Sequence, residues 1–497
     1  MMNPKDKERK EQVAHIIEIP DEYRLVVDDQ EGVDDPLHVL WWEHKEDEEK
    51  TIEVLLNRHT GELIELKIED DGYFSINNET LDNNKAKKIA NAFIKEYTKE
   101  GLEFYTYVTV KDDWRGWKEI NYMQEVNGYP LPDTGCVVRV HSSGNVVNFR
   151  YNGGENIQKK PLWPIEIVDE STVLDNLKAR QDIRLVFADL TYSSCEYKSG
   201  EEVKGYHLVY EPEPSHAFID ASTGKDLFEP GHYKLAPTVP VEKTVKSTRK
   251  KDVFDLLDWD VEKFIKVDEK EDEYEVRMKF VLKEEAQKEI EEKDPYSMDE
   301  FYKKHFPMLQ HDKFVVITVD KKTNQLIACL MWTNEKDRKS ILSREQCLEK
   351  ALQFLEEIIP NATKYVQLWD DYEVEEGIER FSFSIHVNDI CVAGKYIMIN
   401  INTENGAVMH YSGESSNFIK ELLTYETTPK VTKEKALEIY KEAIRVKLEW
   451  YIDNDAEETV YQLLYKQTTD ENYKEPFECS REIRYIDAHT GEKIWSK

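Results

Sequence analysis

The chain has 497 residues, of which 40% are hydrophobic and 34% are charged, and its formal net charge is −34 at pH 7. This length exceeds what one hydrophobic core supports, and this composition is not that of a disordered chain, so we expect several small globular parts. The acidic charge disfavours nucleic acid and anionic membranes as partners, because their phosphates would be repelled. It favours a basic protein or bound cations, or it serves solubility alone.

Six of the first ten residues are charged, and no apolar stretch follows them. This pattern predicts no secretory signal, and no run approaches the roughly 18 apolar residues of a membrane span. The six cysteines stand alone without a CxxC pair, which is typical of reduced thiols. We therefore expect a cytoplasmic protein without a disulfide framework.

A short hairpin turn recurs along the chain, first at residues 57–61 with the sequence Asn-Arg-His-Thr-Gly. An Asn or Asp at its start can accept a hydrogen bond from the backbone two residues on, and its last position requires a positive φ. Gly fills that position in five copies and Asn, the next most tolerant residue, in the sixth. The copies end at Gly61, Gly144, Gly224, Asn324, Gly406 and Gly491, and the one at 140–144 is shortened.

The intervals between these positions are 83, 80, 100, 82 and 85 residues, which predicts six repeats of about eighty residues. The expected repeats span about 1–70, 71–152, 168–229, 252–334, 340–412 and 429–497. The first three form one half, residues 1–229, and the last three a homologous half, residues 252–497. A proline-containing linker at 230–251 joins the halves, and a charged insertion at 283–305 lengthens the fourth repeat.

The second repeat opens with a predicted helix. Apolar residues recur at helical spacing over 86–97, with Asp82 or Asn83 as the N-cap and Gly101 as the stop.

The fifth repeat has the same apolar stripe over 348–359, after a capping box formed by Ser343 and Gln346. A third helix of this kind begins at 432–440, and runs such as 381–386 alternate as strands do. The predicted fold class is therefore α+β. We expect a tandem array of small units, each a helix packed on an antiparallel sheet of about four strands.

Histidines do not form a recognisable metal motif, because there is no HExxH sequence and no His-Cys cluster. His38 and His44 lie on an expected strand around 41–42, where a sheet histidine is favoured over a ligand. His305 and His311 border the insertion and are expected in a solvated loop.

Two carboxylate-rich segments, 28–35 and 452–458, are dense enough for a calcium ion, although neither follows the EF-hand register. The chain has no nucleophile elbow, no Walker loop and no GxGxxG sequence. We therefore assign no catalytic, cofactor-binding or metal-ligating residue and expect no cofactor.

Aromatic residues cluster at Trp114 and Trp117 and again at 369–372. At loop tips they would be binding anchors. The favoured alternative is that they cover a sheet edge or the next repeat.

The turn at 487–492 and its copy at 220–225 resemble the DA-x-TG-(E/K) hairpin of PepSY domains, and 431–436 resembles the start of the PepSY helix. Residues 19–26, followed by the tryptophan pair at 41–42, resemble the YcdB/YcdC repeated-domain family, which is built of PepSY-like pieces. The resemblance covers nearly the whole chain as two copies.

PepSY-type domains are associated with inhibitory propeptides of secreted peptidases and with binding or regulation at the bacterial cell envelope. This resemblance implies no catalytic residue, and the absence of a predicted signal sequence argues against the propeptide role. The leading hypothesis is a non-enzymatic binding or regulatory protein that contacts a basic protein or peptide through an extended acidic surface. The alternatives are a small-molecule or calcium-binding protein, an enzyme such as a hydrolase, and a purely structural role.

Overall fold

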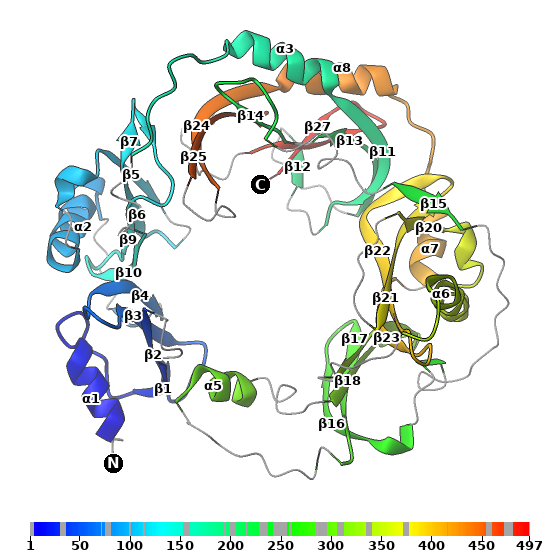
Figure 1. The fold of residues 1–497 in the computed structure, drawn as a ribbon, viewed down its shortest axis with the longest axis horizontal. Coiled ribbons are helices and arrows are strands. Elements are labelled where there is room, and N and C mark those ends of the chain that lie inside the picture. The colour runs from blue at the N-terminus through cyan, green and yellow to red at the C-terminus, as the bar shows by residue number, and fades with distance from the viewer. Residues whose placement is uncertain are drawn as a thin grey trace. The chain divides into compact units, whose positions relative to one another are not determined.

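The computed structural model divides into two compact units, and Figure 1 labels its helices and strands. Unit 1 comprises residues 1–167, 290–307 and 448–464, and unit 2 comprises 168–289, 308–447 and 465–497. The residues that the structure describes are 4–29, 36–70, 72–74, 81–98, 101–112, 115–152, 160–191, 195–197, 205–214, 216–227, 237–241, 256–257, 261–284, 286, 296–305, 313–333, 340–370, 377–414, 416–453, 460–471 and 481–496.

Unit 1 is built on an antiparallel sheet of eight strands in the order β1-β2-β3-β4-β10-β9-β6-β5. Strands β1–β4 come from the first repeat and the other four from the second, and the pairing of β4 with β10 joins the two sets. The strands are β1 (Tyr23–Asp29), β2 (Leu37–His44), β3 (Thr51–Asn57), β4 (Leu63–Glu69), β5 (Tyr107–Asp112), β6 (Lys118–Met123), β9 (Cys136–Val140) and β10 (Val146–Tyr151), with a small hairpin of β7 (Glu125–Val126) and β8 (Tyr129–Pro130).

The helices of unit 1 are α1 (Pro4–Val13), α2 (Asn83–Tyr97) and α5 (Met298–His305), with a short 3-10 turn at Leu102–Phe104. Helix α2 packs on β6, β9 and β10, and its buried face is made of Ala86, Ala90 and Ile94. The two alanines allow the helix axis to approach the sheet closely. The unit 1 core holds large side chains such as Trp42 and Phe149.

Unit 2 contains a branched sheet whose main path is β12-β27-β26-β13-β11-β22-β23-β19-β18-β17-β16, with β21, β20 and β15 branching from β22. Its strands are β11 (Asp182–Asp189), β12 (Cys195–Tyr197), β13 (Tyr206–Glu213), β15 (Thr238–Pro240), β16 (Phe264–Glu271), β17 (Glu275–Leu282), β18 (Lys313–Asp320), β19 (Leu326–Thr333), β20 (Val366–Trp369), β21 (Ile378–Val387), β22 (Ile390–Asn402), β23 (Val408–Ser412), β26 (Ile483–Asp487) and β27 (Lys493–Ser496). Strand β14 (Phe218–Asp220) also lies in this unit, whereas β24 (Arg445–Asp453) and β25 (Val460–Thr468) each cross the boundary between the units.

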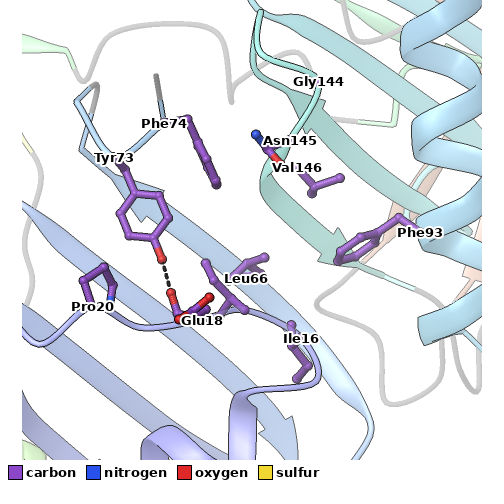
Figure 2. A pocket seen from close by; sticks show the side chains of 11 residues that line it. Ile16, Glu18, Pro20, Leu66, Tyr73, Phe74, Phe93, Gly144, Asn145 and Val146 are labelled. Atoms are coloured by element: carbon purple, nitrogen blue, oxygen red, sulfur yellow. Dashed lines mark hydrogen bonds between the residues drawn. The ribbon is translucent and has the colours of Figure 1, made fainter. Parts of the chain in front are cut away.

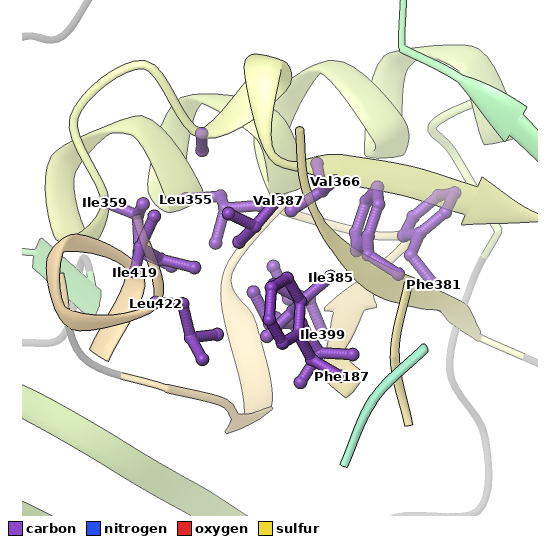
Figure 3. Close-up of a cluster of buried hydrophobic side chains, with 14 of the residues drawn as sticks. Phe187, Leu355, Ile359, Val366, Phe381, Ile385, Val387, Ile399, Ile419 and Leu422 are labelled. Atoms are coloured by element: carbon purple, nitrogen blue, oxygen red, sulfur yellow. The ribbon is translucent and has the colours of Figure 1, made fainter. Parts of the chain in front are cut away.

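The helices of unit 2 are α3 (Glu170–Arg180), α6 (Arg344–Ile358), α7 (Ser416–Leu422) and α8 (Lys433–Ala443), with short 3-10 turns at Val261–Lys263 and Ala362–Lys364. Figure 3 shows part of the core: Leu355 of α6 and Ile419 of α7 lie in one cluster with Ile385 and Ile399 of the sheet and Phe187 of β11. Because Phe187 belongs to the third repeat, that repeat shares its core with the fifth.

The α+β class is confirmed, and the duplication is visible in the sheet pairings. In the second half β19 pairs with β23, just as β4 pairs with β10 in the first. The capping box of Ser343 and Gln346 is present, and Asp82 caps α2 by accepting from the Lys85 N–H at 2.8 Å. Helix α2 ends at Tyr97, however, before Gly101, because Thr98 is already extended.

The third and sixth repeats are not self-contained. Helix α8 of the sixth repeat packs on β11 and β13 of the third, and β13 pairs with β26 of the sixth. Residues 238–240, inside the predicted linker, form strand β15 on β20. The predicted insertion contributes α5 to unit 1 through residues 298–305, and its residues 285 and 287–295 lie outside the described part.

In five of the six recurrent turns the N–H of the last residue donates to the carbonyl four residues earlier, whereas in the shortened copy Gly144 donates to His141, three residues earlier. The last residues of all six turns have positive φ, from 57° at Asn324 to 88° at Gly144. In the last copy the Asp487 carboxylate accepts from the backbone N–H groups of His489 and Thr490, both at 2.8 Å. The prediction that the Asn or Asp at the start of the turn is structural is confirmed by these bonds and by their equivalents at Asn57, Asp220, Asp320 and Asn402.

Replacing Gly491 by alanine is expected to destabilise the protein by about 1–2 kcal/mol, because φ is +78° and an added Cβ disfavours that conformation. Steric clash does not cause this loss of stability, because the added Cβ would lie 3.5 Å from its nearest neighbouring atoms. Denaturant unfolding measures the change. Asn324→Gly is the control and should shift stability by less than about 1 kcal/mol. A neutral Gly491→Ala variant would contradict this account of the turn.

Within the described residues, no helix has both the length and the apolar character that a membrane crossing needs. The five cysteines that the structure describes are thiols.

Candidate functional site

The sheet of unit 2 has two faces, and α6 packs on one of them. The other, here called the α6-distal face, is identified by strand register. Ser384 of β21 lies opposite Gln367 of β20 and Tyr396 of β22, so these side chains share one face. Following the register onward, the α6-distal face includes Trp369, Ser384, Tyr396, Met398, His410, Leu330, Trp332, Val316, Phe314, Val281 and Ile265.

This face carries large apolar side chains. Phe314 and Val316 are buried on it and form a small cluster separate from the main core. Leu330 and Trp332, opposite them on β19, are 37% and 47% exposed, and Tyr396, farther along the face on β22, is 46% exposed. Exposed aromatic residues on a rigid sheet are suited to contacting a partner, because they offer a large contact area with little loss of side-chain entropy.

A pocket of about 550 Å³ lies on the same face. It is located where β11 and β22 run parallel for only three residue pairs, Val186–Ala188 against Cys391–Ala393, before they part. The lining residues are Arg184, Glu211, Glu213, Pro237, Thr238, Trp369, Ser384, His386, Cys391, Val392, Ala393, Gly394, Lys395 and Tyr396. The rings of Trp369 and Tyr396 lie 6.0 Å apart in a tilted pair.

The charged groups of the pocket pair with one another. Arg184 Nε lies 2.9 Å from a Glu211 oxygen and 3.1 Å from a Glu213 oxygen, so two carboxylates share one guanidinium. Lys395 pairs with Glu414 at 2.8 Å. Glu414 does not line the pocket, so the lining itself holds two carboxylates, Glu211 and Glu213, and two cations, Arg184 and Lys395.

The same pocket contains a serine–histidine pair, since the Ser384 Oγ lies 3.0 Å from His386 Nε2. The two residues are neighbours on one face of β21, and Ser384 also lies 3.3 Å from the Gln367 carbonyl. His386 Nδ1 has no hydrogen-bond partner in the described part of the chain, so no carboxylate orients the ring. Burial lowers the pKa of His386 and raises the pKa of the neighbouring Cys391 thiol. The pair lacks the orienting group of a catalytic triad, and the thiol is not activated.

Unit 1 has a second pocket, of about 520 Å³, which Figure 2 shows. Tyr73 and Phe74 form one wall, and Phe93 with the turn at 144–146 forms the other. The Tyr73 hydroxyl donates a hydrogen bond to the Glu18 carbonyl oxygen. The pocket brings together no pair of groups suited to acid–base chemistry among the residues that the structure describes.

The first carboxylate-rich segment is engaged by the protein itself. Asp28 is buried and contacts Arg9 at 2.8 Å, His38 at 2.7 Å and Lys5 at 3.3 Å. Asp29 accepts the backbone N–H of Met298 at 2.6 Å. These two residues are therefore structural, whereas 30–35 lie outside the described residues, as do 454–458 of the other segment.

His38 was expected to be a sheet histidine rather than a metal ligand, and it is buried on β2 and hydrogen-bonded to Asp28. The expectation for His305 was wrong: it is the last residue of α5, it is half-buried, and its Nε2 lies 3.3 Å from Glu43. Helix α5 carries it to a strand more than 250 positions earlier, which no local pattern could indicate. His311 lies outside the described residues.

The aromatic residues divide between the two interpretations. Trp117 is buried and packs against His141, so it covers the sheet as the favoured alternative predicts. Trp369 lines the pocket instead. Trp114 and 371–372 lie outside the described residues.

A family model described as "YcdB, YcdC repeated domain" matches residues 6–153 and 260–415. The chain is 26% identical over 495 residues to the uncharacterized protein YcdB of Bacillus subtilis (strain 168), covering 98% of this chain and 97% of that protein. It is 22% identical over 503 residues to the uncharacterized protein YcdC of the same organism, covering 98% and 99%. Among solved structures, the Bacillus megaterium YpeB C-terminal domain aligns with a TM-score of 0.24 and 15% identity, covering 49% of this chain and 92% of that one.

Proposed function

The chain belongs to the YcdB, YcdC repeated-domain family, and from that premise and the α6-distal face we propose that it is a non-enzymatic protein that binds basic polypeptide segments. The observation that carries the proposal is the pocket in which Trp369 and Tyr396 form an aromatic pair and Glu211 and Glu213 share a single guanidinium. Aromatic faces attract ammonium and guanidinium groups, and a nearby negative charge strengthens that preference. A lysine or arginine side chain of a partner therefore fits this pocket.

The rest of the α6-distal face extends the site. Leu330 and Trp332 lie on β19, on the same face as Tyr396, so a bound segment could contact them with apolar side chains. The net charge of −34 would speed association with a basic partner and make binding weaken with salt. The proposed contact surface is therefore aromatic, and the negative charge of the whole chain acts at longer range.

The PepSY-like organisation is part of the proposal. Helices α2 and α6 each pack on strands of their own repeat, which supports a helix-on-sheet unit for the second and fifth repeats. We also propose a cytoplasmic location, which fractionation of cells carrying the tagged chain would test.

Binding of short fluorescein-labelled lysine- and arginine-containing peptides to the full chain, followed by anisotropy, tests the function. Trp369→Ala and Tyr396→Ala should each weaken binding about 5- to 30-fold, the loss of a cation–π contact worth about 1–2 kcal/mol. Tyr274→Ala is the matched control, because Tyr274 is an exposed aromatic residue in the turn between β16 and β17, and it should have no effect.

Peptides in which alanine replaces the basic residues should not bind, and high salt should weaken binding of the basic ones. Equal binding of basic and alanine peptides, or unchanged binding by Trp369→Ala, would contradict the proposal.

A small-molecule function is the second candidate, because the pocket volume lies within the range of small-ligand sites. Such a ligand would carry an amine or guanidine group. Thermal-shift measurements with free amines would separate it from a peptide, since a small ligand should raise the melting temperature without any flanking residues.

A further inference from the structure

Helix α5 brings three possible ligands together in unit 1. It packs against the sheet through Phe301, whose ring lies 4.7 Å from that of Trp41. His305 at its C-terminal end then faces Glu43 of β2 and Glu48 of the following loop. One nitrogen or oxygen atom from each of the three side chains lies within 4.8 Å of the other two.

The hydrogen bonds of His305 define which ring nitrogen faces the cluster. Nδ1 lies 3.0 Å from the carbonyl oxygen of Phe301, which can only accept, so Nδ1 carries a proton. In the neutral ring Nε2 is then an acceptor, and it lies 3.3 Å from a Glu43 carboxylate oxygen. Two acceptors at this distance repel each other unless a proton or a cation lies between them.

The geometry suits a metal ion. Nitrogen and oxygen ligands about 2.0 Å from a tetrahedral zinc ion lie about 3.3 Å from each other. A histidine that binds metal through Nε2 and donates Nδ1–H to a backbone carbonyl is the usual arrangement, because that second bond fixes the tautomer and the ring.

Glu43 supplies an independent observation. Its side chain is only 2% exposed, and its Oε2 has no hydrogen-bond partner among the described residues. The nearest cation is Arg24, whose Nη2 lies 3.6 Å from that oxygen and 3.8 Å from Glu48. Arg24 is 42% exposed, so it can move towards solvent. A buried carboxylate compensated only at this distance is costly.

We propose that Glu43, Glu48 and His305 bind one divalent transition-metal ion of the zinc class. One imidazole and two carboxylates match zinc or cobalt, whereas calcium takes oxygen ligands only. Three protein ligands leave a coordination position for water. The ion would also hold α5 against the sheet of unit 1.

Isothermal titration of the full chain with Zn²⁺ tests the site, and Co²⁺ absorption reports its ligands. One ion should bind per chain, and His305→Ala and Glu43→Gln should each weaken binding at least about ten-fold. His59→Ala is the matched control, because His59 is exposed in the turn between β3 and β4, and it should bind as the parent does.

Arg24→Gln keeps all three ligands and removes the competing cation, so it should bind Zn²⁺ more tightly and give the same Co²⁺ spectrum as the parent. This variant keeps the test decisive if Glu43→Gln fails to fold. No stoichiometric Zn²⁺ binding by the parent, unchanged binding by His305→Ala, or weaker binding by Arg24→Gln would each overturn the proposal in favour of an ion-pair cluster.

Discussion

Replacing Asp28 by asparagine will destabilise unit 1 by about 3–5 kcal/mol at neutral pH, the usual cost of removing one partner from a buried charge network. Burial alone would raise the pKa of Asp28. The hydrogen bonds from His38 and Arg9 and the positive charges of Arg9 and Lys5 outweigh burial and hold that pKa well below its usual range. The substitution would leave Arg9 and His38 at this buried position without their carboxylate.

The same network gives a pH dependence with a definite sign. A carboxyl group whose pKa is lower in the folded state stabilises the fold above its unfolded pKa, near 3.8, and loses that contribution as the pH falls further. The parent should therefore lose stability steeply below about pH 4, and Asp28→Asn should lose less over that range. Denaturant unfolding at a series of pH values measures both effects.

Asp47→Asn is the control for this prediction, because the Asp47 side chain is 44% exposed and its pairing with Lys50 is a surface contact. It should change stability by less than about 1 kcal/mol. An Asp28→Asn variant as stable as Asp47→Asn at neutral pH would show that the network does not stabilise unit 1.

Replacing Phe187 by alanine will destabilise unit 2 by about 3–5 kcal/mol, because its fully buried ring would leave a cavity in the shared core. Although Phe187 belongs to the third repeat, it lies in the same core as Leu355 of α6 and Ile399 of β22 (Figure 3). Amide hydrogen exchange should therefore accelerate in α6 and β22.

Phe149→Ala is the matched substitution in unit 1, where the ring is also fully buried. It should accelerate exchange in α2 and β9 instead. Faster exchange in α2 rather than α6 after Phe187→Ala would show that residues 168–229 fold with the first half of the chain.

The turns and the helix caps could be predicted from the sequence, because each depends on interactions between residues a few positions apart. The turn residues require a positive φ, and the structure has Asn324 at 57° where the other copies have glycine. The capping box at Ser343 and the cap at Asp82 could be predicted for the same reason, since each is a hydrogen bond between residues three apart. The end of α2 was predicted near Gly101, whereas the helix ends at Tyr97, and His305 was expected in a loop but ends helix α5.

The candidate sites depend on long-range pairing, which no local pattern encodes. The sequence indicated Trp369 only as part of an aromatic cluster, for which a covering role was favoured, and the pocket residues Arg184 and Glu213 come from β11 and β13, more than 150 residues earlier. His305 meets Glu43 only because α5 packs against the sheet of unit 1.

The sequence by itself determined the repeats, the turns, the caps and the α+β class, because each depends on contacts within a few residues or on periodicity along one element. Only the tertiary structure decided which strands pair, and so which repeats share a core. Alternating hydrophobicity defines the buried face of a strand, but it does not specify the strand beside it. For that reason β13 could pair with β26 of a distant repeat while the pattern of each repeat stayed the same.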